Sequence, residues 1–214
     1  NEDLTNHSMS RTNIGVWNVR GINSRSKHFE INRMIGQNNV GLFGLLETRI
    51  KSSKMQNNVF SSDGKWSLVT NYSHHCGGRI WVIWDSNYFE LDEISIYTQC
   101  IHMNVRDNSR NLNYWLTMVY GQNQAADREA LWLQLGQFRS RIRGAWCMMG
   151  DFNAISNLND RMGGQAVSNA DIHPMKRMIE ECEVEDLKTK GAVDTWNNKD
   201  RKRDVEGEGV DQGG

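Results

Sequence analysis

The chain has 214 residues, 38% of them hydrophobic and 24% charged, which suits one large domain or two small ones and excludes a disordered chain. Its mean hydropathy is -0.67, and no apolar run approaches the roughly 20 residues of a membrane span. Lys and Arg total 25 against 26 for Asp and Glu, a net charge of -1, so any contact with nucleic acid must depend on a local basic patch.

The first part of the sequence predicts a strand, a helix and a second strand. These segments are residues 13–19, 24–37 and 40–46. The first alternates and holds β-branched and aromatic side chains, the second places Ile31, Met34 and Ile35 at helical spacing, and the third (VGLFGLL) is an apolar run typical of a buried strand. If the two strands are parallel, their carboxyl ends share one edge of the sheet, where open α/β sheets bind ligands.

The middle of the chain is rich in strands separated by turn-forming clusters of Gly, Asn, Asp and Ser, so hairpins are expected. The four predicted strands are residues 66–70, 80–84, 93–105 and 114–120.

A helix, a strand and a second helix are expected next. Their ranges are 127–142, 145–149 and 171–183. Asp127 is a plausible N-cap of the first helix. The apolar stripes of the two helices are formed by Leu131, Leu135, Phe138 and Ile142, and by Met175, Met178, Ile179 and Cys182. The elements together predict an α/β fold with a mixed sheet, or two packed sheets, flanked by helices.

Clusters that contain polar residues end four of the apolar strands. The polar residues are Asn18 in WNVRG, Glu47 in LLETR, Tyr120 in VYG, and Asp151 and Asn153 in GDFN. Mg²⁺ takes oxygen ligands, usually one or two carboxylates together with substrate phosphate. Strand ends that converge with these groups would therefore form a site for a hard divalent cation and a phosphate.

Each of these residues also has a simpler structural interpretation. Asn18 could cap a loop, Glu47 and Arg49 could form a surface ion pair, and Tyr120 could be a core aromatic. Asp151 and its neighbours could form a turn. The occurrence of all four clusters in this order favours a functional site over independent coincidence.

In order and spacing, these motifs resemble the endonuclease/exonuclease/phosphatase family, and most closely the endonuclease domain of plant LINE-type (non-LTR) retrotransposons. The resemblance runs from Ile14 to about Asn197 and includes REALW at residues 128–132 and Asp194-Thr195-Trp196. It implies a four-layer α/β sandwich of two packed mixed β-sheets flanked by helices. It also implies Mg²⁺-dependent hydrolysis of phosphodiesters, with Mn²⁺ as a second candidate ion. The expected partner is DNA, which is nicked at a target site before reverse transcription.

The resemblance also assigns roles to the polar residues at the strand ends. Glu47 would hold the metal and Asn18 would assist it, because carboxylate and amide oxygens are hard ligands. Asp151 would orient or deprotonate the attacking water, Asn153 would hydrogen-bond the phosphate or the water, and the Tyr120 hydroxyl would contact the phosphate.

Thr195 matches a position near the nucleic acid, and Trp196 is the tryptophan with the best surface context. The other five considered are more often core residues: Trp81, Trp84, Trp115, Trp132 and Trp146. The basic residues Arg139, Arg141 and Arg143, and the run 201–203, could meet phosphates, although such groups are usually solvated.

Three domain segments are expected: a polar N-terminal segment at 1–12, the endonuclease-like domain at 13–197 and a polar, disordered tail at 198–214. The family's terminal Ser-Asp-His does not occur in the sequence, so we expect a C-terminally truncated copy, once fused to a downstream reverse transcriptase, that is weak or inactive. Two alternatives remain open: a non-catalytic fragment that binds nucleic acid or is inert, and a phosphatase of the same fold.

The four cysteines are isolated in the sequence, with no Cys-x-x-Cys pair and no apolar signal segment before them. We expect them to be reduced, and Cys147 to be a packing residue in its apolar run. An intracellular protein is therefore predicted, and a nuclear one if it acts on DNA as the resemblance implies.

Overall fold

The computed structural model describes residues 11–53, 65–156 and 168–187 of the chain. Their strands are β1 (Asn13–Asn18), β2 (Val40–Leu46), β3 (Trp66–Thr70), β4 (Ile80–Asp85), β5 (Phe89–Ile96), β6 (Cys100–Asp107), β7 (Leu112–Tyr120) and β8 (Trp146–Asp151). Their helices are α1 (Arg25–Gln37), α2 (Ala125–Arg141) and α3 (Asn169–Cys182). The described residues up to Glu183 belong to one compact unit, and Val184–Leu187 belong to a second.

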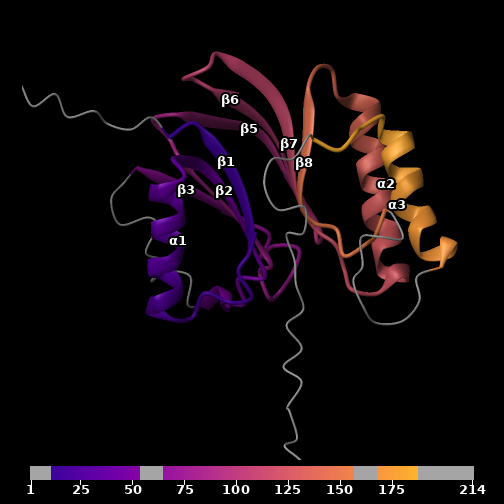
Figure 1. The fold of residues 1–214 in the computed structure, drawn as a ribbon, viewed down its shortest axis with the longest axis horizontal. Coiled ribbons are helices and arrows are strands. Elements are labelled where there is room, and N and C mark those ends of the chain that lie inside the picture. The colour runs from indigo at the N-terminus through magenta and orange to yellow at the C-terminus, as the bar shows by residue number, and fades with distance from the viewer. Residues whose placement is uncertain (1–10, 54–64, 157–167, 188–214) are drawn as a thin grey trace, which may run out of the picture. The chain divides into compact units, whose positions relative to one another are not determined.

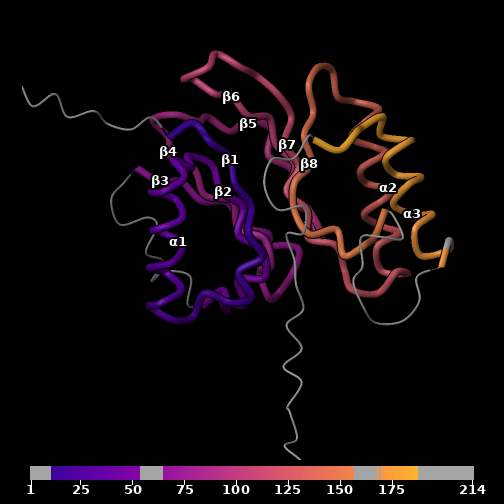
Figure 2. Tube along the Cα trace, viewed as in Figure 1, coloured from indigo at the N-terminus to yellow at the C-terminus, as the bar shows by residue number. Residues whose placement is uncertain are grey.

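The first sheet has the strand order β1-β2-β4-β3. β1 and β2 are parallel and joined through α1, while β4 is antiparallel to both β2 and β3. Every residue of β2 is buried, as its apolar sequence predicts for a strand covered on both faces. The chain can be followed through β1, α1 and β2 in the indigo part of the trace in Figure 2.

The second sheet has the strand order β5-β6-β7-β8. β5, β6 and β7 form antiparallel pairs, and β8 joins β7 in parallel after the α2 crossover. Each sheet therefore contains one parallel pair connected by a helix, and the carboxyl ends of the two strands in a parallel pair lie at the same edge.

The two sheets pack face to face around a shared apolar core. Leu42 and Val82 from the first sheet contact Ile101 and Met118 from the second within one cluster. On the outer face of the first sheet, Ile31 and Ile35 of α1 pack on a second cluster that includes Phe43 and Trp81.

Helix α2 covers the outer face of the second sheet, where Phe138 stacks on His102 of β6, and α3 lies beside α2 (Figure 1). The predicted α/β architecture of two packed mixed sheets flanked by helices is confirmed. Within the described ranges, none of the helices combines the length and apolar character needed to span a bilayer.

One predicted strand was wrong. Residues 93–105 were expected to form a single strand, but the chain turns at Tyr97–Gln99 between β5 and β6. This turn contains no Gly, Pro, Asn, Asp or Ser, the residues that dominate turns. It is held instead by the buried Asn71, whose Nδ2 donates to the carbonyls of Tyr97 and Thr98 at 3.4 and 2.9 Å. A turn held by a side chain this distant in sequence leaves no local signal.

Smaller differences concern helix ends and one apolar position. Helix α2 begins at Ala125 with Gln124 as its N-cap, so the predicted cap Asp127 lies in the first turn instead. Met34 was expected on the buried stripe of α1, but it is 38% exposed, because Ile31 and Ile35 alone face the sheet. The stripe Leu131, Leu135, Phe138 and Ile142 is buried as predicted.

Candidate active site

The site is formed where one parallel pair from each sheet ends. In the first sheet Asn18 of β1 lies opposite Leu46 of β2, and Glu47 follows directly. In the second sheet Tyr120 of β7 lies opposite Asp151 of β8. The polar residues that follow the apolar strands in the sequence are thereby gathered at one end of the sandwich.

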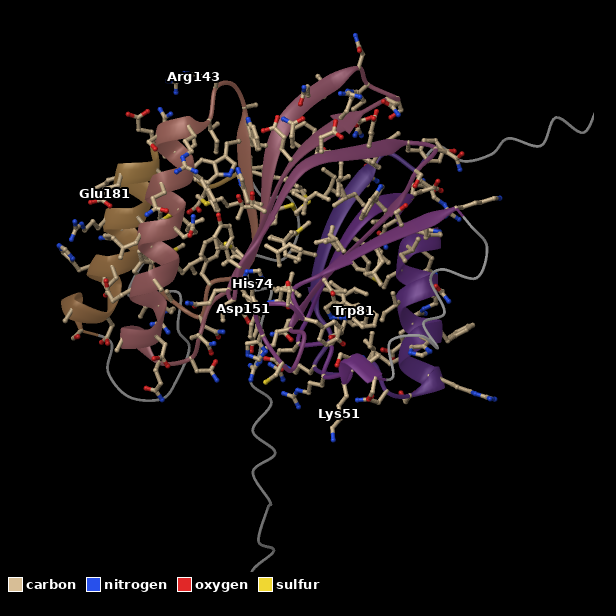
Figure 3. The ribbon with its side chains drawn as sticks, turned by 180° about the vertical axis from the view of Figure 1, so that it is seen from behind. Lys51, His74, Trp81, Arg143, Asp151 and Glu181 are labelled. Carbon is tan, nitrogen blue, oxygen red and sulfur yellow. The ribbon has the colours of Figure 1, made fainter. Side chains whose placement is uncertain are left out.

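Asn18 connects the carboxylates of the two sheets. Its Nδ2 donates to Asp151 Oδ2 at 2.9 Å and to Glu47 Oε1 at 3.3 Å. Because both partners are acceptors, this hydrogen bonding orients the amide with its nitrogen toward them and its oxygen away. Figure 3 shows Asp151 toward the end of the fold that also carries His74 and Lys51, with Arg143 at the opposite end.

Tyr120 adds a second contact between the sheets. Its hydroxyl donates to Glu47 Oε1 at 2.7 Å and accepts a hydrogen bond from Nη1 of Arg79 at 3.1 Å. Burial raises the pKa of Tyr120 to about 12, and the neighbouring Glu47 carboxylate contributes to that rise. The phenol is therefore neutral at physiological pH and acts as a hydrogen-bond donor.

Glu47 is held at the end of β2 by an uncommon backbone conformation. Its φ is 53°, in the left-handed region that few glutamates adopt. Its backbone N–H donates to the carbonyl of Arg79 at 2.8 Å, and the buried hydroxyl of Thr48 donates to the carbonyl of Gly78 at 2.7 Å. These bonds attach the strand end to the segment that leads into β4.

The carboxylate of Glu47 is favoured in its ionised form. Burial alone would raise the pKa of Glu47, but hydrogen bonds from Tyr120, Arg49 and Asn18 outweigh burial and hold it below its ordinary value. The Arg49 guanidinium donates to Oε2 at 2.7 Å from a largely exposed position. Glu47 is thus an anionic oxygen ligand across the physiological pH range.

The end of β8 is shaped by Gly150 and by Asn153. Gly150 has a φ of 144°, and a Cβ there would lie 2.0 Å from the carbonyl oxygen of Val119, so only glycine fits. Beyond it, the backbone N–H of Asn153 donates to Asp151 Oδ1 at 3.0 Å, and Nδ2 of Asn153 donates to the Gly121 carbonyl at 2.7 Å. Asn153 therefore lies beside Asp151 and fixes it through the backbone.

The oxygen atoms of the site suit a hard divalent cation. The Oδ1 atom of Asn18 is buried and accepts no hydrogen bond. A buried polar atom without a partner costs about 1–3 kcal/mol, so such an atom calls for a missing donor or cation. Glu47 and Asp151 add carboxylate oxygens, which Mg²⁺ and Mn²⁺ prefer. No cluster of three or more His, Cys, Asp and Glu side chains occurs in the described segments, so an ion held by these carboxylates would complete its coordination with water, substrate or amide oxygens.

The structure also shows contributors that the sequence did not indicate. Arg79 contacts Tyr120, Asn71 holds the turn between β5 and β6, and Gln99 fixes the loop after β7 by accepting from the backbone N–H of Gln122 at 2.7 Å. Each reaches the site through strand pairing between distant segments. Only the clustering of His, Cys, Gly and Arg at 74–79, before β4, could have drawn attention to this loop.

The predicted nucleic-acid contacts Thr195 and Trp196 lie outside the described residues. Among the tryptophans assigned to the core, Trp81 is fully buried, while the other four are half-buried.

All four cysteines are free, with Cys100 and Cys182 buried, Cys147 half-buried and Cys76 exposed. The expected segments 1–12 and 198–214 lie wholly or mostly outside the described ranges, and their boundaries remain predictions.

Comparison with known proteins defines the fold. No protein-family model and no curated protein sequence matches the chain. Solved structures do match, and the chain has the endonuclease/exonuclease/phosphatase fold. A Bacteroides thetaiotaomicron protein of that family is 12% identical, with a TM-score of 0.52 over 66% of this chain and 63% of its own.

Two further matches come from proteins of the same fold. The human Nocturnin catalytic domain with a bound sulfate anion is 13% identical, with a TM-score of 0.50 over 65% of this chain and 64% of its own. D. rerio TDP2 in complex with a single-strand DNA product is 15% identical, with a TM-score of 0.50 over 65% and 60%. The chain spans less than two thirds of the length of these structures. At such identities the comparison establishes the fold, and the chemistry must be argued from the site.

Proposed function

We propose that the chain is a divalent-metal-dependent phosphodiester hydrolase that nicks DNA. The observation that carries this proposal is the junction of Glu47 and Asp151 through Asn18, whose buried Oδ1 has no hydrogen-bond partner. Two carboxylates from different sheets would repel one another unless they shared a donor or a cation. In the structure the amide supplies the donor. Turned over, it would direct its buried oxygen toward the same carboxylates, where that oxygen would be a ligand for the ion.

Glu47 and Asn18 would hold the ion, which is Mg²⁺ or Mn²⁺. When bound, it supplies charge neutralisation at the phosphate. The protein's own residues supply the rest: Asp151 has open lone pairs on both carboxylate oxygens for a water proton, and the neutral Tyr120 hydroxyl donates a hydrogen bond. The backbone and side chain of Asn153 keep Asp151 in place.

The reaction is an in-line displacement by water. The water oxygen forms a bond to phosphorus while its proton passes to Asp151. The bond between phosphorus and the leaving oxygen breaks, and that oxygen takes a proton from solvent water. The Tyr120 hydroxyl, which donates to Glu47 in the structure, would turn its proton to a phosphate oxygen as charge builds there, which lowers the barrier.

Two observations support DNA as the proposed substrate. D. rerio TDP2, which shares the fold, is seen with a single-strand DNA product. The motifs WNVRG, LLETR, REALW and GDFN resemble those of plant LINE-type endonuclease domains. We therefore include in the proposal an origin in such an element, a former fusion to a reverse transcriptase and a nuclear location.

A plasmid-nicking assay tests the proposal. Wild-type protein should convert supercoiled plasmid to the open circle with Mg²⁺ or Mn²⁺ and should stop when EDTA is added. Glu47→Gln should abolish the reaction. Glu181→Gln is the matched control, because Glu181 is an exposed carboxylate on α3 that pairs with Arg177, away from the site.

Three outcomes would contradict the proposal: nicking that survives Glu47→Gln, nicking that persists in EDTA, or no nicking at any metal concentration. In the same experiment a small phosphate monoester is offered beside the plasmid. Cleavage of the ester alone would favour the phosphatase alternative. The weak activity expected from the sequence is measured by the turnover rate of the wild-type protein.

A further inference from the structure

Two arginines lie beside the carboxylates of the site, and their surroundings differ. Arg49 is 64% exposed and pairs with Glu47 Oε2 at 2.7 Å. Arg79 is half-buried at the entry to β4 and forms no ion pair within the described ranges, although its own carbonyl accepts from the Glu47 backbone. A guanidinium without a counterion, this close to a pair of carboxylates, is available to an anion from solution.

Contacts with Tyr120 fix the orientation of the Arg79 guanidinium. Nη1 donates to the Tyr120 hydroxyl at 3.1 Å, and the guanidinium carbon lies 5.4 Å from the centre of the Tyr120 ring. Arginine carries five N–H donors in a rigid plane, and the Tyr120 hydroxyl takes one of them. Within the described residues the other four have no side-chain or backbone acceptor.

The positive charge of Arg79 acts on its surroundings. Burial lowers the pKa of His75, and the charge of Arg79 lowers it further, as expected of a cation with no carboxylate partner among the described residues. The Tyr120 hydroxyl, with one lone pair facing Arg79, directs its proton to Glu47. The hydrogen bonds therefore run from Arg79 to Tyr120 and from Tyr120 to Glu47, which accepts, and Arg79 keeps N–H groups that have no acceptor among the described residues.

We propose that Arg79 binds a backbone phosphate of the DNA strand through its free N–H groups while its plane stays against Tyr120. The inference rests on the proposed function, because it takes the site's substrate to be a nucleic acid. Guanidinium groups bind phosphate in a two-pronged geometry and remain charged at all relevant pH values. Glu47 and Asp151 repel the phosphate, and Arg79 offsets that repulsion where the strand enters.

Binding of a fluorescein-labelled oligothymidylate in EDTA tests this contact apart from cleavage. Wild type and Arg79→Met are compared by fluorescence anisotropy over a range of KCl concentrations. Loss of one charge-assisted contact should weaken binding by about tenfold or more. It should also reduce the slope of log K against log[KCl] by about 0.7, the value for one phosphate on a single strand.

Three further variants separate the phosphate contact from other effects. Arg79→Lys keeps the charge, so it should keep the salt slope and still lose affinity, since an ammonium cannot stack on Tyr120 and bridge to phosphate together. Tyr120→Phe keeps the ring but loses the hydroxyl, and should weaken binding less than Arg79→Met. Arg143→Met, at the opposite end of the fold, should change neither affinity nor slope.

The outcomes decide between the two proposals. An Arg79→Met protein that binds with the wild-type affinity and slope overturns the Arg79 assignment, and so does a wild-type protein that binds no oligonucleotide. If wild type binds with the expected dependence on Arg79 but does not nick plasmid in Mg²⁺, the phosphate contact stands and the hydrolase proposal falls. If Arg79→Met is poorly folded by circular dichroism, the affinities of Arg79→Lys and Tyr120→Phe decide instead, and wild-type affinity in both overturns the assignment.

Discussion

Both ends of the sandwich carry carboxylates at the ends of strands, yet the surroundings of these carboxylates differ between the two ends. At the end opposite to the site, Asp85 and Asp107 are almost fully buried, at 3% and 1% exposure. At the site, Glu47 and Asp151 are half-buried, and Asn18 between them keeps a buried oxygen without a partner. The two ends therefore differ in the exposure of their carboxylates and in the unpartnered oxygen of Asn18, not in residue type.

The carboxylates at the opposite end are saturated with local donors. Asp107 accepts from the backbone N–H and hydroxyl of Ser109 and from the backbone and guanidinium of Arg110. Asp85 accepts from the backbone and side chain of Asn87 and pairs with Arg11. Both aspartates fix turns, and their lone pairs are used within the protein. At the site end Glu47 also accepts three hydrogen bonds, but it is more exposed than Asp85 and Asp107. Asp151 accepts two within the described residues and Asn18 Oδ1 accepts none, so we expect function there and stability at the other end.

The sharpest test of this contrast is Asp151→Asn, because the substitution removes a charge and a proton acceptor without changing shape. Nicking should fall by about 10²–10⁴-fold, the usual contribution of a general base. The thermal midpoint of unfolding should also fall modestly, because the introduced amide has one oxygen where Asp151 accepts from both Asn18 and the Asn153 backbone. A variant that nicks at the wild-type rate, as measured in the plasmid assay, would remove Asp151 from the mechanism.

The buried His102 should make the folded protein less stable in acid. His102 lies between the rings of Trp115 and Phe138, at centroid distances of 4.9 and 4.0 Å, and burial lowers its pKa to about 4. The unfolded chain binds a proton near pH 6.5 and the folded chain only near pH 4, so stability falls as the pH drops through that window. The loss should reach about 3 kcal/mol at pH 4.

Urea unfolding between pH 7 and pH 4 measures this loss. His102→Gln keeps a neutral partner for the Thr117 hydroxyl, which lies 2.8 Å from Nδ1 of His102, and should show a much flatter profile over the same range. An equally steep profile in the variant would assign the acid sensitivity to the carboxylates at the two ends.

The sequence predicted most of the frame of the site. The buried run at 40–46, the alternation at 13–19 and the helical stripe at 127–142 are local patterns, and each appears as expected. Because parallel strands place their carboxyl ends together, polar residues after these strands were expected to meet, and Asn18, Glu47, Tyr120 and Asp151 do meet. The particular four-layer fold came from the resemblance of the motifs to a family.

Features that depend on long-range pairing could not be predicted. Arg79 reaches Tyr120 because β4 pairs with β2, which places the start of β4 beside Glu47. The turn at Tyr97–Gln99 depends on Asn71, more than twenty residues earlier. Neither arrangement has a period or a turn motif in the sequence, so only the folded chain reveals them.

At the saturated end, Asp107→Asn should lower the free energy of unfolding by about 2 kcal/mol. The new amide either turns a donor toward the Arg110 guanidinium or, in the opposite orientation, leaves the backbone N–H groups of Ser109 and Arg110 unpaired. Urea titration measures the change. Asp92→Asn is the matched control, since Asp92 is about half exposed and pairs only with Arg106, and it should cost less than about 0.5 kcal/mol. The nicking rate of folded Asp107→Asn should equal that of wild type, and a lower rate would contradict the division of labour between the two ends.

The smallest expected effect on stability is that of Glu47→Gln. The amide oxygen of the introduced glutamine can still accept from Tyr120 and Asn18, and the only interaction lost is the pair with the largely exposed Arg49, which is worth about 0–1 kcal/mol. In EDTA the variant should therefore unfold within a few degrees of wild type.

With excess Mg²⁺ or Mn²⁺ the unfolding midpoints of the two proteins should separate. An ion that binds the folded state raises its stability by RT ln(1 + [L]/Kd), and a neutral amide is a weaker ligand than the carboxylate it replaces. Differential scanning fluorimetry with increasing metal measures this separation. An equal rise in the midpoint for both proteins would mean that the ion binds elsewhere. A large loss of stability in EDTA would mean that Glu47 belongs with Asp85 and Asp107 as a structural carboxylate.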